Sequence, residues 1–202
     1  SPPLLKVEIE KRIPVKAGLG GGSADAAAIL RLGVGEVEDL AGLALLLGAD
    51  VPSQLNPKPL LVEGVGQRLT TLPVPAEHWV VLLPFETGLS TRAVFDEADR
   101  MKLGRSQEEI DEISGRLWAV ATNAVSPLAY PALLVNDLEP AAISLKPEIG
   151  LGKERLRSAG ALFTGMTGTG PTVFGLFSDR ESAESAADAV GPEAIVCQGG
   201  VT

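Results

Sequence analysis

The chain has 202 residues, a formal net charge of −9 at pH 7, 45% hydrophobic residues and 21% charged residues. This composition is typical of a folded globular protein with one large domain or two small ones. An acidic chain without a run of lysine or arginine lacks the positive surface that binds nucleic acid or anionic membranes, so we expect neither partner.

Single copies of cysteine and histidine narrow the possible chemistry further. Cys197 and His78 are too few for an intrachain disulfide or a Cys/His zinc site. Cys197 follows an apolar run that resembles a strand, which predicts a buried, inert thiol. His78 lies in a proline-flanked turn and is expected at the surface. The longest apolar stretch, residues 40–49, has about half the length of a membrane span, so a cytoplasmic protein is expected.

The first part of the chain alternates between strand and helix signals. Residues 4–10 alternate apolar and charged side chains, which predicts a strand with one solvated face. The glycine-rich residues 18–22 precede Ser23, a predicted N-cap for an alanine-rich helix. A second apolar helix is predicted over residues 37–47, ending at Gly48. The remaining predictions are a loop over residues 53–59 and a strand over residues 60–63.

Pro73 and Pro75 indicate a boundary, so we expect one domain over residues 1–75 and a second over residues 76–202. In the second domain we predict four helices, over residues 92–100, 106–121, 151–159 and 180–190. We also predict four strands, over residues 79–83, 161–163, 172–177 and 194–197. A second glycine-rich loop, residues 164–171, lies between the second and third of these strands.

The glycine-rich residues 18–22 and Ser23 are the clearest candidate for a binding site. Successive glycines before a helix allow backbone N–H groups to converge on an anion at the positive end of the helix dipole, as a phosphate requires. The segment is not a Walker loop, because no Lys-Ser/Thr pair follows. A Rossmann loop fits poorly, because the preceding predicted strand alternates instead of being continuously apolar. The alternative is a packing turn with no ligand.

Two further features are candidates for chemistry. Asp50 stands just after an apolar helix, where the helix dipole disfavours a negative charge, so a structural reason for it is weak. It could accept a proton from a hydroxyl, face a metal-bound phosphate, or cap a neighbouring loop. The hydroxyls of Thr164, Thr167 and Thr169 could line a phosphate site, and a simple hairpin or a support for another loop explains that segment equally well.

Three segments, PVKAGLGGGSA from Pro14, GADVP from Gly48 and TGTGP from Thr167, occur in an order that resembles the GHMP kinase superfamily. The segments GLGGGSADAA, LGADVP and VEGVGQ are most similar to the members that phosphorylate a cytidyl-methylerythritol in non-mevalonate isoprenoid biosynthesis. The resemblance implies an α+β fold with an S5-like N-terminal domain, here incomplete, and a ferredoxin-like C-terminal domain. It also implies that ATP and Mg²⁺ bind between the two domains.

The resemblance assigns roles to individual residues. Asp50 would be the catalytic acidic residue near the substrate hydroxyl, and Thr91 and Phe95 would contact the cytidine end of the substrate. Phe95 could stack on the base or belong to the core. No residue is assigned to a metal. ATP phosphates would be bound by Pro14, Val15, Lys16, Ala17, Gly18, Leu19, Gly20, Gly21, Gly22, Ser23 and Ala24, with Thr169 and Gly170 supporting that loop.

The sequence departs from the family pattern in three places. The N-terminal segment that carries the family's catalytic lysine is absent from the 202 residues, which leads us to expect a fragment of a longer chain. The connection over residues 32–36 is short, and Ser53 replaces an aromatic residue.

The expected function is ATP-dependent phosphorylation of the 2-hydroxyl of the cytidyl-methylerythritol. The alternatives are a kinase for a mevalonate-type substrate or homoserine, or a catalytically incomplete nucleotide-binding fragment. The sequence does not predict the oligomeric state.

Overall fold

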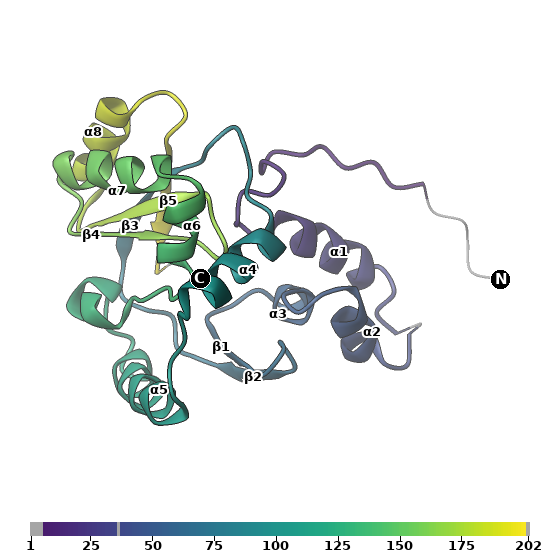
Figure 1. Cartoon of the computed structure of the whole chain (residues 1–202). Helices are drawn as coiled ribbons and strands as arrows, with labels where there is room; N and C mark the ends of the chain where they lie inside the picture. Colours follow the sequence, from purple (N-terminus) through teal and green to yellow (C-terminus); the bar gives the residue numbers. More distant parts are fainter. Residues whose placement is uncertain (1–5, 36, 201–202) are drawn as a thin grey trace.

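The structure is a computed structural model that describes residues 6–35 and 37–200. Its N-terminal part combines short helices with a β-hairpin (Figure 1). These elements are α1 (Gly21–Arg31), α2 (Leu40–Leu47), α3 (Val51–Leu55), β1 (Leu60–Glu63) and β2 (Arg68–Thr71). β1 and β2 pair antiparallel, and the three helices share a small core of Ala27, Ala44 and Val51.

The C-terminal part is built around a four-stranded sheet. Its elements are β3 (His78–Leu83), α4 (Thr91–Met101), α5 (Gln107–Ala121), η1 (Pro127–Ala129), η2 (Pro131–Leu133), α6 (Glu139–Leu145), α7 (Glu148–Ser158), β4 (Phe163–Met166), β5 (Val173–Phe177), α8 (Arg180–Val190) and β6 (Ile195–Gly199). The strands are antiparallel in the order β4-β5-β3-β6. Because helices connect β3 to β4 and β5 to β6, this is the expected ferredoxin-like arrangement.

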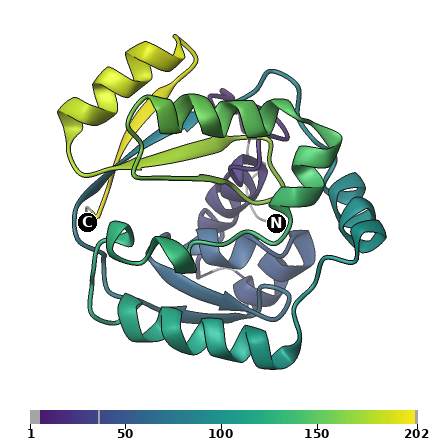
Figure 2. The same cartoon turned by 60° about the vertical axis from the view of Figure 1, so that its left-hand side comes forward.

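The main core lies between this sheet and the helices that cover it. α7 and α8 lie on the same face of the sheet in both views (Figures 1 and 2). Phe177 and Leu83 from the strands and Ile149 and Leu156 from α7 are each at most 1% exposed. Within the described part of the chain, no helix is long and apolar enough to cross a membrane.

Side-chain caps define the starts of three helices that the sequence predicts as helical ranges. Ser106 caps α5 in a capping box with Glu109, so the helix begins where residues 106–121 predict it. Ser90 accepts a hydrogen bond from the backbone of Ala93 at the start of α4, and Asp179 accepts one from Ser182 at the start of α8. In each case a side-chain oxygen satisfies a backbone N–H that the first helical turn leaves free.

Several predictions for the N-terminal part are wrong. Residues 6–10 form no strand, because no neighbouring strand pairs with them in the described chain, and residues 4 and 5 lie outside it. Ser23 is not the N-cap: α1 begins earlier, because the left-handed Gly20 turns the chain into the helix without a side-chain cap. α2 begins at Leu40 instead of residue 37, because Asp39 caps it by accepting a hydrogen bond from the Gly42 N–H at 2.8 Å.

Residues 53–59 are only partly loop. Val51–Leu55 form α3, in which Pro52 occupies the first turn, where a missing N–H costs nothing. The hairpin strand β2 and the helix α6 carry no strong periodic pattern and were not predicted. α7 starts three residues before the predicted residue 151, at Glu148.

The sheet also decides three predictions for single residues, two of which it corrects. His78 is 8% exposed instead of lying at the surface, because it opens β3 and its Nδ1 lies 2.9 Å from the Ala76 carbonyl oxygen. Thr164 belongs to β4, not to the second glycine-rich loop, and β4 begins at Phe163 instead of residue 161. Cys197 is half-buried on β6, and burial raises the pKa of its thiol, in keeping with an inert cysteine.

Candidate functional site

A cavity of about 790 Å³ lies where five segments that are distant in sequence meet. We call it the main cavity. It brings together eight residues that the sequence predicted for a site, namely Lys16, Gly18, Gly20, Asp50, Thr91, Phe95, Thr169 and Gly170. A smaller hollow of about 240 Å³ beside it is lined by Lys11 and by every residue from Pro14 to Ser23. Ala24 lines neither and lies inside α1.

The first glycine loop, residues 18–22, presents free backbone donors to the smaller hollow. The first backbone N–H group that donates a helical hydrogen bond in α1 is that of Ala24, which donates to the Gly20 carbonyl at 2.9 Å. The N–H groups of residues 21–23 therefore have no partner within the helix, and no side chain caps them. A Cβ added at Gly20 or Gly22 would meet nothing within 4 Å. The loop thus combines free donors, the positive end of a helix and room for an anion.

The glycines of this loop have different conformational roles. Gly18 and Gly20 have φ of 75° and 67°, in the left-handed region that favours glycine. Gly21 is not in that region, and a Cβ there would lie 3.1 Å from the Ile13 side chain. Gly22 is therefore the better position for a substitution that blocks only the ligand.

The second glycine loop, residues 167–171, packs directly against the first. A Cβ on Gly18 would lie 2.7 Å from the carbonyl oxygens of both Thr167 and Gly170. The Thr172 N–H also donates to the Ala17 carbonyl at 3.2 Å. The second loop is closed on itself, because Gly170 N–H donates to the Thr167 carbonyl at 2.8 Å. The structure thus places it as a support for the first loop.

Asp50 lies on the wall of the main cavity, immediately before α3. The sequence placed it at the unfavourable end of α2, but α3 begins at the next residue, so Asp50 also stands at the positive end of a short helix. Ser53 Oγ donates to the Asp50 carbonyl at 2.8 Å. Behind Asp50, Gly66 of the hairpin turn, with φ of 95°, leaves no room for a Cβ against the Ala49 carbonyl. The hairpin therefore fixes the backbone next to Asp50.

Thr91 and Phe95 face the main cavity from α4. Thr91 Oγ1 lies 3.2 Å from Thr169 Oγ1, within hydrogen-bond distance, which links α4 to the second glycine loop. Phe95 is 50% exposed, whereas Val94 and Ala98 on the same helix are buried. Phe95 is thus not a core residue, and its ring is available to a ligand.

The sequence reasoning missed Asn136 and Asp137, which line the main cavity from the turn before α6. Asn136 Nδ2 donates to the carbonyls of Met166 and Gly168 at 3.0 and 2.8 Å. The only sequence signal is an Asn-Asp pair between the apolar residues Val135 and Leu138, and such a pair is common in ordinary turns.

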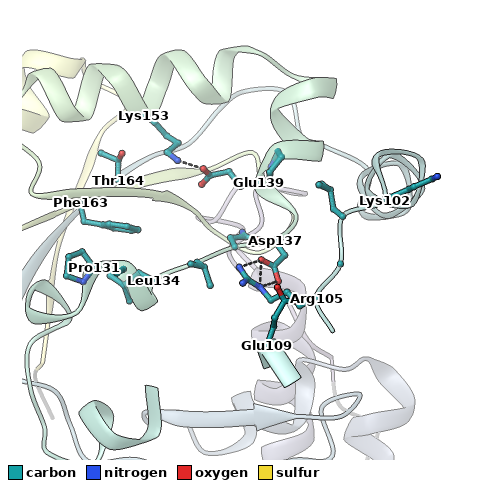
Figure 3. A pocket seen from close by; sticks show the side chains of 16 residues that line it. Lys102, Arg105, Glu109, Pro131, Leu134, Asp137, Glu139, Lys153, Phe163 and Thr164 are labelled. Atoms are coloured by element: carbon teal, nitrogen blue, oxygen red, sulfur yellow. Dashed lines mark hydrogen bonds and ion pairs between the residues drawn. The ribbon is translucent and has the colours of Figure 1, made fainter. Parts of the chain in front are cut away.

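A second cavity, of about 610 Å³, adjoins the main one through residues 135–137. Figure 3 shows two ion pairs between its side chains, while Lys102 points away from them. Arg105 binds both carboxylate oxygens of Asp137, with Nη2 to Oδ1 at 2.6 Å, and Lys153 pairs with Glu139. Thr164, expected at a phosphate site, lies here and accepts from Arg157 at 3.3 Å. Two of its cations, Arg105 and Lys153, are thus already paired with carboxylates.

Carboxylates are sparse around the main cavity. No group of three or more His, Cys, Asp or Glu residues is positioned to hold a metal ion within the described ranges 6–35 and 37–200. The cavity wall carries Asp50 and Asp137, and Arg105 occupies Asp137. Among the described residues, Asp50 is thus the carboxylate on this wall without an ion pair.

Comparison with known families agrees with this arrangement. The family described as GHMP kinases N terminal domain matches residues 2–54, and GHMP kinases C terminal matches residues 123–196. A crystal structure of 4-(cytidine 5'-diphospho)-2C-methyl-D-erythritol kinase is 31% identical, with a TM-score of 0.72 over 94% of this chain and 68% of that one. The chain belongs to the GHMP kinase family and has its α+β fold.

Curated relatives point in the same direction. A 4-diphosphocytidyl-2-C-methyl-D-erythritol kinase from Geobacter sp. (strain M21) is 40% identical over 91% of this chain and 64% of its own length. The protein of the same name from Mesorhizobium japonicum is 38% identical over 92% of this chain and 62% of its own length. The chain thus spans about three fifths of the length of these relatives.

A homoserine kinase structure from Cytophaga hutchinsonii is also similar, with a TM-score of 0.73 over 95% of this chain and 68% of that one. At 23% identity this likeness concerns the fold alone.

Proposed function

We propose that this chain acts as an ATP-dependent kinase that phosphorylates an alcohol group of a small molecule. The observation that carries the proposal is that Gly18 and Gly20 of the first glycine loop line the same cavity as Asp50, while the free donors of residues 21–23 line the smaller hollow beside it. Free N–H donors suit the charged oxygens of a transferring phosphate, and a nearby carboxylate suits the attacking hydroxyl. Domain boundaries at residues 75 and 76 belong to the same proposal and are supported by the start of the C-terminal sheet at His78.

In this proposal the residues of the first glycine loop bind ATP. Backbone N–H groups of residues 21–23 hold phosphate oxygens at the start of α1, and Lys16, on the wall of both hollows, adds a positive charge nearby. Thr169 and Gly170 keep the loop in place from behind. Asp50 orients the substrate hydroxyl and accepts its proton as the phosphate is transferred.

Mg²⁺ accompanies ATP in such reactions and neutralises charge on the phosphates. Magnesium typically takes one or two protein carboxylates and fills its remaining positions with phosphate oxygens and water. The cavity wall offers two carboxylates, Asp50 and the Arg105-bound Asp137, so such an ion would be held chiefly by phosphate oxygens and water.

For the substrate, we propose the 2-hydroxyl of 4-diphosphocytidyl-2-C-methyl-D-erythritol. The relatives that are 38 and 40% identical carry that name. The half-exposed ring of Phe95, beside Thr91 on the cavity wall, offers a flat surface on which a cytosine could stack.

A panel of alcohols tests this assignment. Purified protein with ATP and Mg²⁺ is given the cytidyl-methylerythritol, mevalonate or homoserine, and ADP formation is followed. We expect turnover with the first compound only. Turnover with another alcohol would keep the kinase and replace the substrate. ATP binding without turnover of any alcohol would favour a nucleotide-binding role.

Replacing the carboxylate tests the role of Asp50. Asp50→Asn keeps the shape of the side chain, so we expect kcat to fall by more than roughly a hundredfold while ATP affinity changes little. Asp188→Asn, on the exposed face of α8, is the matched control and should turn over like the parent. Near-parental turnover by Asp50→Asn would remove the residue from the reaction.

A further inference from the structure

Asn136 makes three hydrogen bonds that fix the orientation of its side-chain amide. Nδ2 donates to the carbonyls of Met166 and Gly168, and Oδ1 accepts from the Leu138 N–H at 3.1 Å. Only this orientation places donors against carbonyls and an acceptor against an N–H. One half-buried side chain therefore connects the turn before α6 to both ends of the turn that leaves β4.

The bonds of Asn136 reach the main cavity through a short series of contacts. Gly168, held by Asn136, belongs to the second glycine loop, and a Cβ there would lie 3.2 Å from the Gly18 carbonyl oxygen. The next backbone contact is the bond from Thr172 N–H to Ala17. A shift of the second loop would therefore displace the backbone of the first.

The Asn136 turn is itself held from the other side. Its neighbour Asp137 accepts three hydrogen bonds from Arg105, which lies just before α5 (Figure 3). Glu139 N–H donates to the Asn136 carbonyl at 3.0 Å, which closes the turn at the start of α6. Asn136 thus lies in a turn that other hydrogen bonds hold in place. A side chain that fixes the position of another segment needs such support.

We propose that Asn136 is a positioning residue, which holds the second glycine loop against the first and so sets the geometry of the phosphate-binding backbone. It acts through Gly168 and Gly18 and need not touch the nucleotide. Its effect on catalysis rests on the proposed kinase function, whereas its effect on the loops does not.

Asn136→Asp is the informative variant, because it keeps the acceptor for Leu138 and replaces the donor with a carboxylate facing two carbonyls. Asn123→Asp is the matched control: Asn123 Nδ2 also donates to a backbone carbonyl, that of Ala119, on exposed α5. Both variants change one amide to a carboxylate and add the same charge.

Hydrogen exchange followed by NMR measures the loops without any nucleotide. In Asn136→Asp we expect the amides of Thr167, Gly170 and Thr172 to exchange roughly tenfold faster than in the parent or Asn123→Asp, in proportion to the loss of two hydrogen bonds. The amides of β5 should be unchanged. Parental exchange at all three amides would overturn the proposal. If Asn136→Asp does not fold, Asn136→Ala, which removes the donors without repulsion, is expected to show the same pattern more weakly.

Calorimetry with ATP then tests the link to the binding site. We expect Asn136→Asp to bind ATP at least roughly tenfold more weakly and Asn123→Asp to bind like the parent. Parental affinity in Asn136→Asp would overturn the link. A parent that binds no ATP would refute the proposed function, and the exchange rates would still decide whether Asn136 positions the loop.

Discussion

The contact between the two glycine loops predicts a graded series of stability losses. Gly18 has both a positive φ and two carbonyl oxygens 2.7 Å from the position of a Cβ. Gly20 has a positive φ and open space, and Gly22 has open space without a positive φ. Substituting alanine at these three glycines separates the cost of the backbone conformation from the cost of the contact.

The magnitudes follow from those two terms. A left-handed conformation costs a residue with a Cβ about 1 to 2 kcal/mol. Forcing extra atoms into a packed contact costs about 1 to 3 kcal/mol more. We therefore expect Gly18→Ala to lower the free energy of unfolding by about 2 to 5 kcal/mol and Gly20→Ala by about 1 to 2 kcal/mol. Gly22→Ala should be neutral or slightly stabilising, because alanine favours helix more than glycine.

Urea unfolding of the parent and the three variants, monitored by circular dichroism at 25 °C, measures these differences. Equal losses for Gly18→Ala and Gly20→Ala would mean that the second loop does not press on Gly18. The support of the first loop by Thr167 and Gly170 would then be refuted.

Two further predictions concern α4. Hydrogen bonds from Arg100 and Ser144 lower the pKa of the Glu97 carboxyl from 4.5 to about 2. The contribution of Glu97 to stability is therefore complete above pH 4.5 and is lost as the pH falls toward 2. Unfolding midpoints across this pH range should fall more steeply for the parent than for Glu97→Gln, and parallel curves would contradict the assignment. Phe95→Ala should raise the KM for the cytidyl substrate roughly tenfold, because the base loses its stacking partner. The KM for ATP and the melting temperature should stay nearly unchanged. A large drop in melting temperature would instead show that Phe95 packs in the protein.

Local signals in the sequence were enough to locate the loops but not their support. The run of glycines before an alanine-rich segment predicts an anion site because glycine conformations and helix ends are local properties. The contact of Gly18 with Thr167 and Gly170 is not local, since about 150 residues separate the loops in sequence and only the tertiary fold brings the first loop against the turn between β4 and β5.

Helices α5 and α8 were predicted well, whereas the start of α2 and the segments that depend on neighbours were not. Ser106 and Glu109 mark the start of α5 in the sequence itself. The alternation over residues 4–10 predicted a strand, but a strand forms only where another one pairs with it. Asp50 was singled out because an acidic residue is unfavourable after the end of an apolar helix. The structure shows that it also stands at the start of α3, where an acidic residue is favourable.

ATP binding by Gly22→Val tests the central claim, that the first glycine loop binds phosphate, most directly. Gly22 lies in α1 without a positive φ, and a Cβ there would meet nothing within 4 Å, so we expect a valine at this position to obstruct mainly a ligand. Gly115→Val, also in a helix with open space around its Cβ, is the matched control. We expect calorimetry to show that the parent and Gly115→Val bind ATP alike, while Gly22→Val, folded and equally stable, loses at least roughly tenfold in affinity. Equal affinity in all three proteins would show that the loop is a turn and does not hold the nucleotide.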